Sequence, residues 1–166
     1  MFNKENFIKK ITNLRKENKT MEAIDELKNI LNKSEYVNDA ELNYQLAWCY
    51  DSIEKESEAV QFYETAIKNG LNKNDLWEAY LGLGSTYRTI GEYSKSKLIF
   101  EEGIKKFPEN KALKVFYAMT LYNLKEYKKS TELLLKLISN NSNDKNIMAF
   151  KEAIEYYSED IEKIFK

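Results

Sequence analysis

The stretch Tyr80-Leu81-Gly82-Leu83-Gly84-Ser85-Thr86-Tyr87 is the most informative part of the 166-residue sequence. Small, aromatic and turn-forming residues continue its pattern downstream: Gly91, Tyr93, Ser96, Phe100, Gly103 and Pro108. This pattern predicts two antiparallel helices, in which Gly84 and Ser96 are small enough to allow close approach. Large residues such as Phe100 are expected to fill the seam, and the proline should delay the start of the next helix.

The same arrangement recurs on both sides of this stretch. Ala47 lies 37 residues before Gly84, and Ala118 lies 34 residues after it. The earlier copy has its packing positions at Leu46, Tyr50, Ala59, Tyr63 and Ala66, and the later copy has them at Tyr117, Leu121, Tyr127, Ser130, Leu134 and Leu137. A more divergent first copy uses Phe7, Ile11, Leu14, Ala23, Leu27 and Ile30. Such recurrence predicts stacked helical hairpins.

The composition agrees with an all-α fold, because one proline and five glycines are too few for the turns of a β architecture. The expected helices cover residues 4–17, 21–32, 39–53, 56–69, 75–90, 93–106, 110–124, 127–140 and 145–165. The last has apolar residues at steps of three and four, namely Ile147, Phe150, Ile154, Tyr157, Ile161 and Ile164. We therefore interpret it as a capping helix that covers the open end of the stack.

These residues resemble the tetratricopeptide repeat family, and the chain looks like its small stand-alone bacterial members. The resemblance implies an all-α, right-handed α-α superhelix of four helix pairs plus a C-terminal capping helix. The repeats are expected at about 4–37, 40–73, 77–110 and 111–144, with the capping helix over 145–165. No linker interrupts the sequence, so a single domain over residues 1–166 is expected.

The resemblance also implies that the first helix of each pair lines a concave groove. Offset by about one position from the packing residues, the partner-binding positions are expected at Tyr44, Trp48, Asp51, Leu81, Ser85, Arg88, Val115, Met119 and Tyr122, with Arg15 and Glu78 also facing inward. Tyr44 and Trp48 are the most informative, because they add large rings on a side of their helix that packing does not use. Surplus apolar surface marks interfaces, and Tyr and Trp are frequent binding hot spots.

Two interpretations of these exposed rings stay open. A partner peptide would be anchored by Trp48 and Tyr122, whereas the C-terminal helix or a second copy of the chain in a homodimer would cover the same rings. The carboxylate-binding residues of chaperone-tail adaptors are not expected. In one register their places hold Tyr44, Trp48, Gly82, Ala112 and Phe116, and in the other Ile8, Thr12, Gln45, Glu78 and Gly82.

Charge and residue types argue against other classes of function. The 26 basic and 27 acidic residues leave a net charge of −1, so neither nucleic acid nor a membrane is an expected partner. Histidine is absent and Cys49 is the single cysteine, which removes the common catalytic and metal-binding clusters. Gly82-Leu83-Gly84-Ser85 lacks the lysine of a phosphate-binding loop. No cofactor or enzymatic activity is expected.

The sequence therefore predicts a cytoplasmic, non-enzymatic scaffold or adaptor that binds a protein or peptide in its concave groove. The alternative hypothesis is a peptide-sensing regulator whose superhelix changes shape when the peptide binds. No stretch approaches the roughly twenty apolar residues of a membrane span. The motifs report on packing, so they leave the identity of the partner open.

Overall fold

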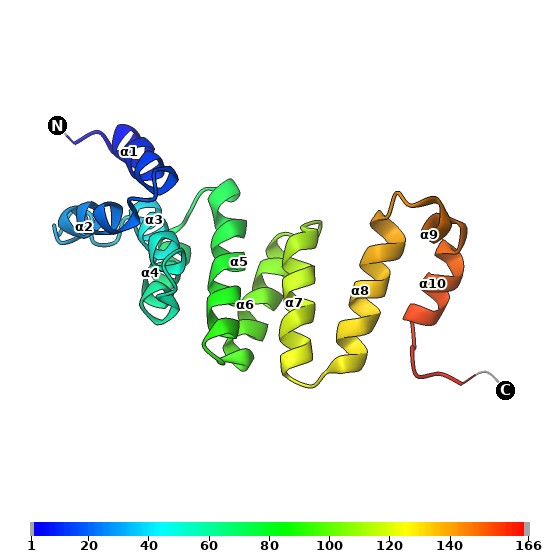
Figure 1. Cartoon of the computed structure of the whole chain (residues 1–166). Helices are drawn as coiled ribbons and strands as arrows, with labels where there is room; N and C mark the ends of the chain where they lie inside the picture. Colours follow the sequence, from blue (N-terminus) through cyan, green and yellow to red (C-terminus); the bar gives the residue numbers. More distant parts are fainter. Residues whose placement is uncertain (1, 165–166) are drawn as a thin grey trace. The chain divides into compact units, whose positions relative to one another are not determined.

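The computed structural model describes residues 2–164, and every regular element in that range is a helix (Figure 1). The first eight helices are α1 (Lys4–Lys16), α2 (Thr20–Leu31), α3 (Ala40–Asp51), α4 (Glu56–Asn69), α5 (Lys73–Thr89), α6 (Tyr93–Lys106), α7 (Lys111–Asn123) and α8 (Tyr127–Asn141). Each lies within a few residues of its predicted range. The all-α fold of consecutive helix pairs is confirmed.

The chain forms two compact units, the first ending at Glu92 and the second beginning at Tyr93. In the first unit, α3 packs against α2 and α4, and α5 packs against α4. In the second unit, α7 packs against α6 and α8. The boundary falls inside the predicted third repeat, between its two helices. The single domain over residues 1–166 stays a prediction.

The turn that joins the helices of a pair has the same geometry in all four predicted repeats. A residue in the left-handed conformation follows each first helix, with φ of 60° at Asn18, 59° at Glu54, 83° at Gly91 and 64° at Lys125. The next backbone N–H then donates to a carbonyl five residues earlier, as in Lys19 to Leu14 at 2.8 Å and Lys55 to Tyr50 at 3.0 Å. This closure satisfies the last carbonyls of a helix. The divergent first repeat therefore has the same turn as the others.

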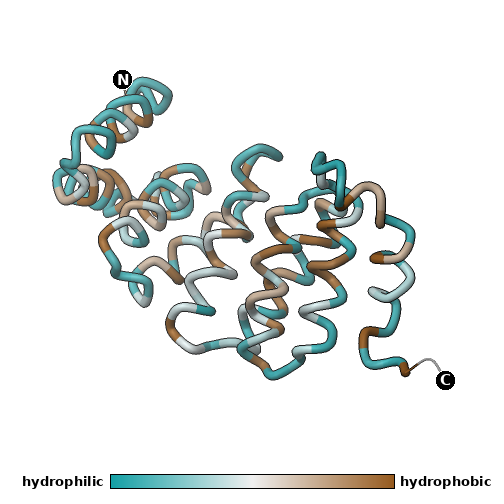
Figure 2. Tube along the Cα trace, turned by 45° about the vertical axis from the view of Figure 1, so that its right-hand side comes forward, coloured by the Kyte–Doolittle hydropathy of each residue, from teal (hydrophilic) through white to brown (hydrophobic). Residues whose placement is uncertain are grey.

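Small residues form the seams inside each unit. Ala47 on α3 and Ala59 and Ala66 on α4 are completely buried, which allows these two helices to approach closely. In the second unit, the hydroxyl groups of Ser96 and Thr120 are joined by a 2.9 Å hydrogen bond between α6 and α7. Figure 2 shows hydrophobic and hydrophilic residues alternating along the helices, as amphipathic packing requires.

The helix predicted over residues 145–165 is wrong in its bounds. The structure has α9 (Lys145–Ala149) and α10 (Lys151–Ser158), separated at Phe150, where φ is −111° and ψ is 15°. Residues 159–164 lie outside any helix, and residue 165 lies outside the described part of the chain. Apolar residues keep their three- and four-residue spacing across Phe150. Periodicity alone therefore could not reveal a break of one residue.

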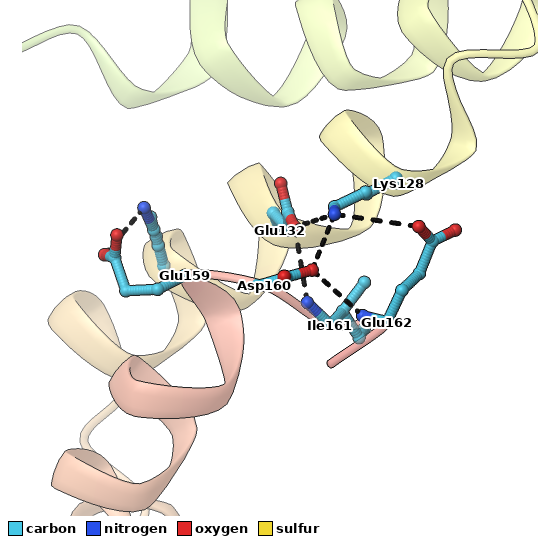
Figure 3. Close-up of polar contacts among 7 residues, drawn as sticks. Lys128, Glu132, Glu159, Asp160, Ile161 and Glu162 are labelled. Carbon is cyan, nitrogen blue, oxygen red and sulfur yellow. Dashed lines mark hydrogen bonds and ion pairs between the residues drawn. The ribbon is translucent and has the colours of Figure 1, made fainter. Parts of the chain in front are cut away.

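The apolar stripe assigned to this capping helix is mostly exposed. The exposed fraction is 67% for Phe150, 54% for Tyr157 and 79% for Ile164, although α10 does pack against α8. Ion pairs hold the residues that follow α10 to α8 (Figure 3). Lys128 of α8 pairs with Asp160 and Glu162, and Lys136 of α8 pairs with Glu159 at 2.8 Å. Ion pairs thus replace much of the apolar contact that the sequence predicts.

Candidate functional site

A groove of about 530 Å³ lies in the first unit, with most of its lining on α3 and α5. Five of the predicted partner-binding residues line it, namely Tyr44, Trp48, Asp51, Leu81 and Ser85. The other lining residues are Ser52, Tyr63, Trp77, Glu78 and Gly82. The fold therefore brings five of the nine predicted side chains to one groove, and their binding of a partner stays a prediction. We call this feature the α3–α5 groove.

Trp48 is the largest exposed side chain of the groove, with 45% of its surface accessible. Its ring is held from two sides. The ring of Tyr44 stacks on it at 6.3 Å between centroids, and the Arg15 guanidinium lies 3.7 Å from its centroid. The Nη2 group of Arg15 in turn donates to Gln45 at 2.7 Å. Contacts within the chain thus hold the orientation of Trp48.

Two buried tyrosines form the floor of the groove. The Tyr44 hydroxyl donates to Glu78 at 2.7 Å, and the Tyr63 hydroxyl donates to Asp51 at the same distance. Burial, together with the neighbouring carboxylates, raises the pKa of both tyrosines well above the usual range. Both hydroxyl groups therefore remain protonated donors at neutral pH.

Gly82 makes room for the Tyr63 ring. A Cβ atom at Gly82 would lie 2.6 Å from Cζ and from the hydroxyl oxygen of Tyr63, closer than any ordinary contact. The sequence assigned the close approach of helices to Gly84. The structure adds a second close approach, in which a residue of α5 without a side chain lets the phenol of α4 reach Asp51 on α3.

Replacing Gly82 by alanine should therefore lower the free energy of unfolding. Forcing a methyl group against the buried Tyr63 ring costs about 1–3 kcal/mol, and the better helix propensity of alanine returns about 1 kcal/mol. We expect a net loss of about 1 kcal/mol in urea unfolding followed by tryptophan fluorescence. Ser57→Ala, at an exposed position of α4, is the control. A Gly82→Ala variant more stable than wild type would contradict the contact with Tyr63.

Asp51 lies at one end of the groove as a half-buried carboxylate. Its oxygens accept hydrogen bonds from Tyr63 at 2.7 Å and from Thr86 at 2.9 Å. Burial raises the pKa of Asp51, and the two hydroxyl donors counteract only part of that rise. Within residues 2–164, no lysine or arginine forms an ion pair with Asp51. Its negative charge is therefore hydrogen-bonded but not neutralised.

The remaining predicted positions lie outside the α3–α5 groove. Arg88 is half-buried on α5 but does not line the groove. Val115 lines an apolar hollow of about 500 Å³ in the second unit, beside Leu134, Leu137 and Ile147. Met119 and Tyr122 are exposed on α7, and the Tyr122 ring contacts that of Tyr127 edge-on, at 5.0 Å between centroids. Joint anchoring by Trp48 and Tyr122 stays a prediction.

Sequence reasoning missed four residues of the groove, namely Ser52, Tyr63, Trp77 and Gly82. Trp77 lies one helical turn before Leu81, so the periodicity could have identified it as a lining residue. Tyr63 was assigned to packing only. Its contact with Gly82 joins residues on different helices, and no local pattern encodes such a contact.

The part of the chain that the structure describes contains no cluster of three histidine, cysteine or acidic side chains that could bind a metal ion. Nor is any helix within residues 2–164 long and apolar enough to cross a bilayer. Cys49 is completely buried, and burial raises the pKa of its thiol. The distinctive chemistry of the site is therefore that of aromatic rings, hydroxyl groups and carboxylates.

Helical hairpins that share one turn geometry, with an exposed groove on α3 and α5, are typical of helical repeat proteins that bind other proteins. The model of the tetratricopeptide repeat family matches residues 40–159, and the chain belongs to that family. Proteins of this family generally act as non-enzymatic scaffolds for protein–protein interaction. The matched range covers predicted repeats two to four. The predicted first repeat lies before the matched range and has the same turn geometry as the others.

Superkiller protein 3 of Saccharomyces cerevisiae is 27% identical to this chain over 84 residues. The aligned segment covers 51% of this chain but only 6% of the yeast protein. The similarity is therefore limited to about half of this chain and a small part of the yeast protein.

Proposed function

We propose that this chain is a protein-binding module whose α3–α5 groove holds a segment of a partner protein. The observation that carries the proposal is the exposed Trp48 ring on the wall of a groove of about 530 Å³. That volume lies in the range of roughly 300–1,000 Å³ that is usual for ligand sites. A few side chains of an extended segment could occupy it.

The way Trp48 is held supports this role. Its contacts with Tyr44 and Arg15 restrict its rotamers, so a partner would lose little side-chain entropy on packing against it. An exposed aromatic ring on a rigid support is typical of a binding hot spot. Trp77 and Leu81 extend the apolar wall along α5.

Replacing Trp48 by alanine should weaken peptide binding about 30-fold, because truncating a hot-spot residue costs about 2 kcal/mol or more. The measurement starts from random ten-residue peptides selected on the wild-type chain. Individual selected peptides are then titrated against wild type and variant by isothermal calorimetry. Circular dichroism establishes that the variant remains helical.

Val37→Ala is the matched control, since Val37 is a 48% exposed apolar residue of the same unit outside the groove. It should leave the affinity unchanged. Equal affinity of Trp48→Ala and wild type would overturn the proposal. A dimer of wild type that Trp48→Ala converts to a monomer would also overturn it, because a second copy would then be the occupant.

A further inference from the structure

The polar groups that line the α3–α5 groove favour a cation. Asp51 and Glu78 contribute carboxylates, Ser52 and Ser85 contribute hydroxyl groups, and no lining residue is basic. The hydroxyl oxygen of Ser85 is buried and has no hydrogen-bond partner within the described residues. The lining therefore offers many acceptors and two carboxylates that form no ion pair within the described residues.

Asp51 has capacity for a further partner. Thr86 donates to both carboxylate oxygens, at 2.9 and 3.1 Å, and Tyr63 donates to one of them. A carboxylate has about four lone-pair sites, so acceptor capacity remains on the groove side. Buried charges in proteins are usually paired. The Asp51 carboxylate without an ion pair lowers the stability of the fold. Pairing with a cationic ligand would recover that stability.

The aromatic walls suit the same ligand. Trp and Tyr rings attract ammonium and guanidinium groups through their faces, and they also pack against the methylene stems of lysine and arginine. The Arg15 guanidinium already lies over the Trp48 ring, so an incoming stem would pack against the part of Trp48 that stays exposed, 45% of its surface. Arg15 does not line the groove and donates a hydrogen bond to Gln45, and within the described residues it forms no ion pair with Asp51.

The two carboxylates are not equivalent. Glu78 bonds the hydroxyl of Tyr44, which precedes Asp51 by seven residues on α3. The two carboxylates therefore have different partners, because Asp51 accepts hydrogen bonds from Tyr63 and Thr86. Asp51 is the more buried of the two and therefore the less screened by solvent. Its attraction for a cation should be the stronger.

We propose that the partner segment inserts a lysine or arginine side chain into the α3–α5 groove, an inference that rests on the function proposed above. The cationic group of this side chain pairs with Asp51, and its methylene stem packs against Trp48. Glu78 adds a weaker, longer-range attraction. The partner is thus a basic peptide segment, recognised by charge as well as by apolar contact.

The test uses four libraries of ten-residue peptides that differ only at a fixed central residue: lysine, arginine, norleucine or glutamate. The other positions carry an equal mixture of alanine, serine, leucine and phenylalanine. Fluorescence anisotropy of labelled libraries measures binding to the full chain. The lysine and arginine libraries should bind about tenfold more tightly than the norleucine library, because a charge-assisted hydrogen bond to a half-buried carboxylate discriminates by that order. The glutamate library should bind least.

Variants locate the source of the preference. Asp51→Asn should reduce the preference for basic residues to within about twofold, and Glu78→Gln should reduce it only in part. Glu64→Gln is the matched control, since Glu64 accepts a hydrogen bond from Tyr87 but lies outside the groove.

Asp51→Asn should fold at least as stably as wild type at neutral pH. Burial raises the pKa of Asp51 in the folded chain, so ionisation costs stability as the pH rises through that pKa.

The outcomes separate this inference from the proposed function. If Trp48→Ala abolishes binding of all libraries but wild type does not prefer basic residues, the inference is wrong and the groove function stands. Preference for the glutamate library would also refute it and would indicate recognition by Arg15, whose Nη1 is buried without a partner in the described structure. If Trp48→Ala binds every library as wild type does, both fail. The wild-type ratio needs no variant, so the test does not depend on the folding of Asp51→Asn.

Discussion

Replacing Phe100 by alanine is expected to lower the free energy of unfolding by about 3–5 kcal/mol. Phe100 lies on α6, and its side chain has no exposed surface. Truncation removes a ring from a site enclosed by packed helices and leaves a cavity that the backbone can only partly fill. Among single substitutions of this chain, it should be one of the most damaging.

Urea unfolding followed by far-UV circular dichroism measures this loss. Both tryptophans, Trp48 and Trp77, lie in the first unit, so their fluorescence would not report directly on α6. Leu98→Ala on the same helix is the control, since 65% of the Leu98 side chain is exposed. Its effect should stay within about 0.5 kcal/mol. Similar losses in both variants would mean that Phe100 is not in a packed core.

The pairing of helices could be predicted from the sequence because it depends on local patterns. Small residues such as Ala47 and Ala59 recur on the faces that pack, and both are completely buried. The positions of the turns could be predicted from the sequence only in part. Asn18 and Gly91 are residue types that tolerate positive φ, whereas Glu54 and Lys125 give no such signal although they adopt the same conformation. The turns at these two residues are identified by the hydrogen bonds that close them in the structure.

The groove shows where periodicity stops being informative. Tyr44, Trp48 and Asp51 follow one another on one side of α3, so helical spacing alone could group them. The hydrogen bonds from Tyr63 and Thr86 to Asp51 join residues from three different helices. Such contacts depend on tertiary packing. The uncompensated charge of Asp51 therefore could not be deduced before the structure was known.

Replacing Ala59 by leucine should destabilise the first unit by about 3 kcal/mol, the upper part of the usual range for overpacking. Ala59 on α4 is completely buried, and α4 packs against α3, where Ala47 is equally buried. A larger side chain must push the two helices apart. Leucine is nearly as good a helix former as alanine, so the loss would come from packing.

Tryptophan fluorescence reports this transition directly, because Trp48 and Trp77 lie on α3 and α5. Glu58→Leu places the same side chain at the exposed neighbouring position and should have little effect. Separation of α3 from α4 would also draw the Tyr63 hydroxyl away from Asp51, so peptide binding should weaken together with stability. An Ala59→Leu variant with wild-type stability would show that the helices do not need the small side chain. The close packing of α3 against α4 would then need another physical cause.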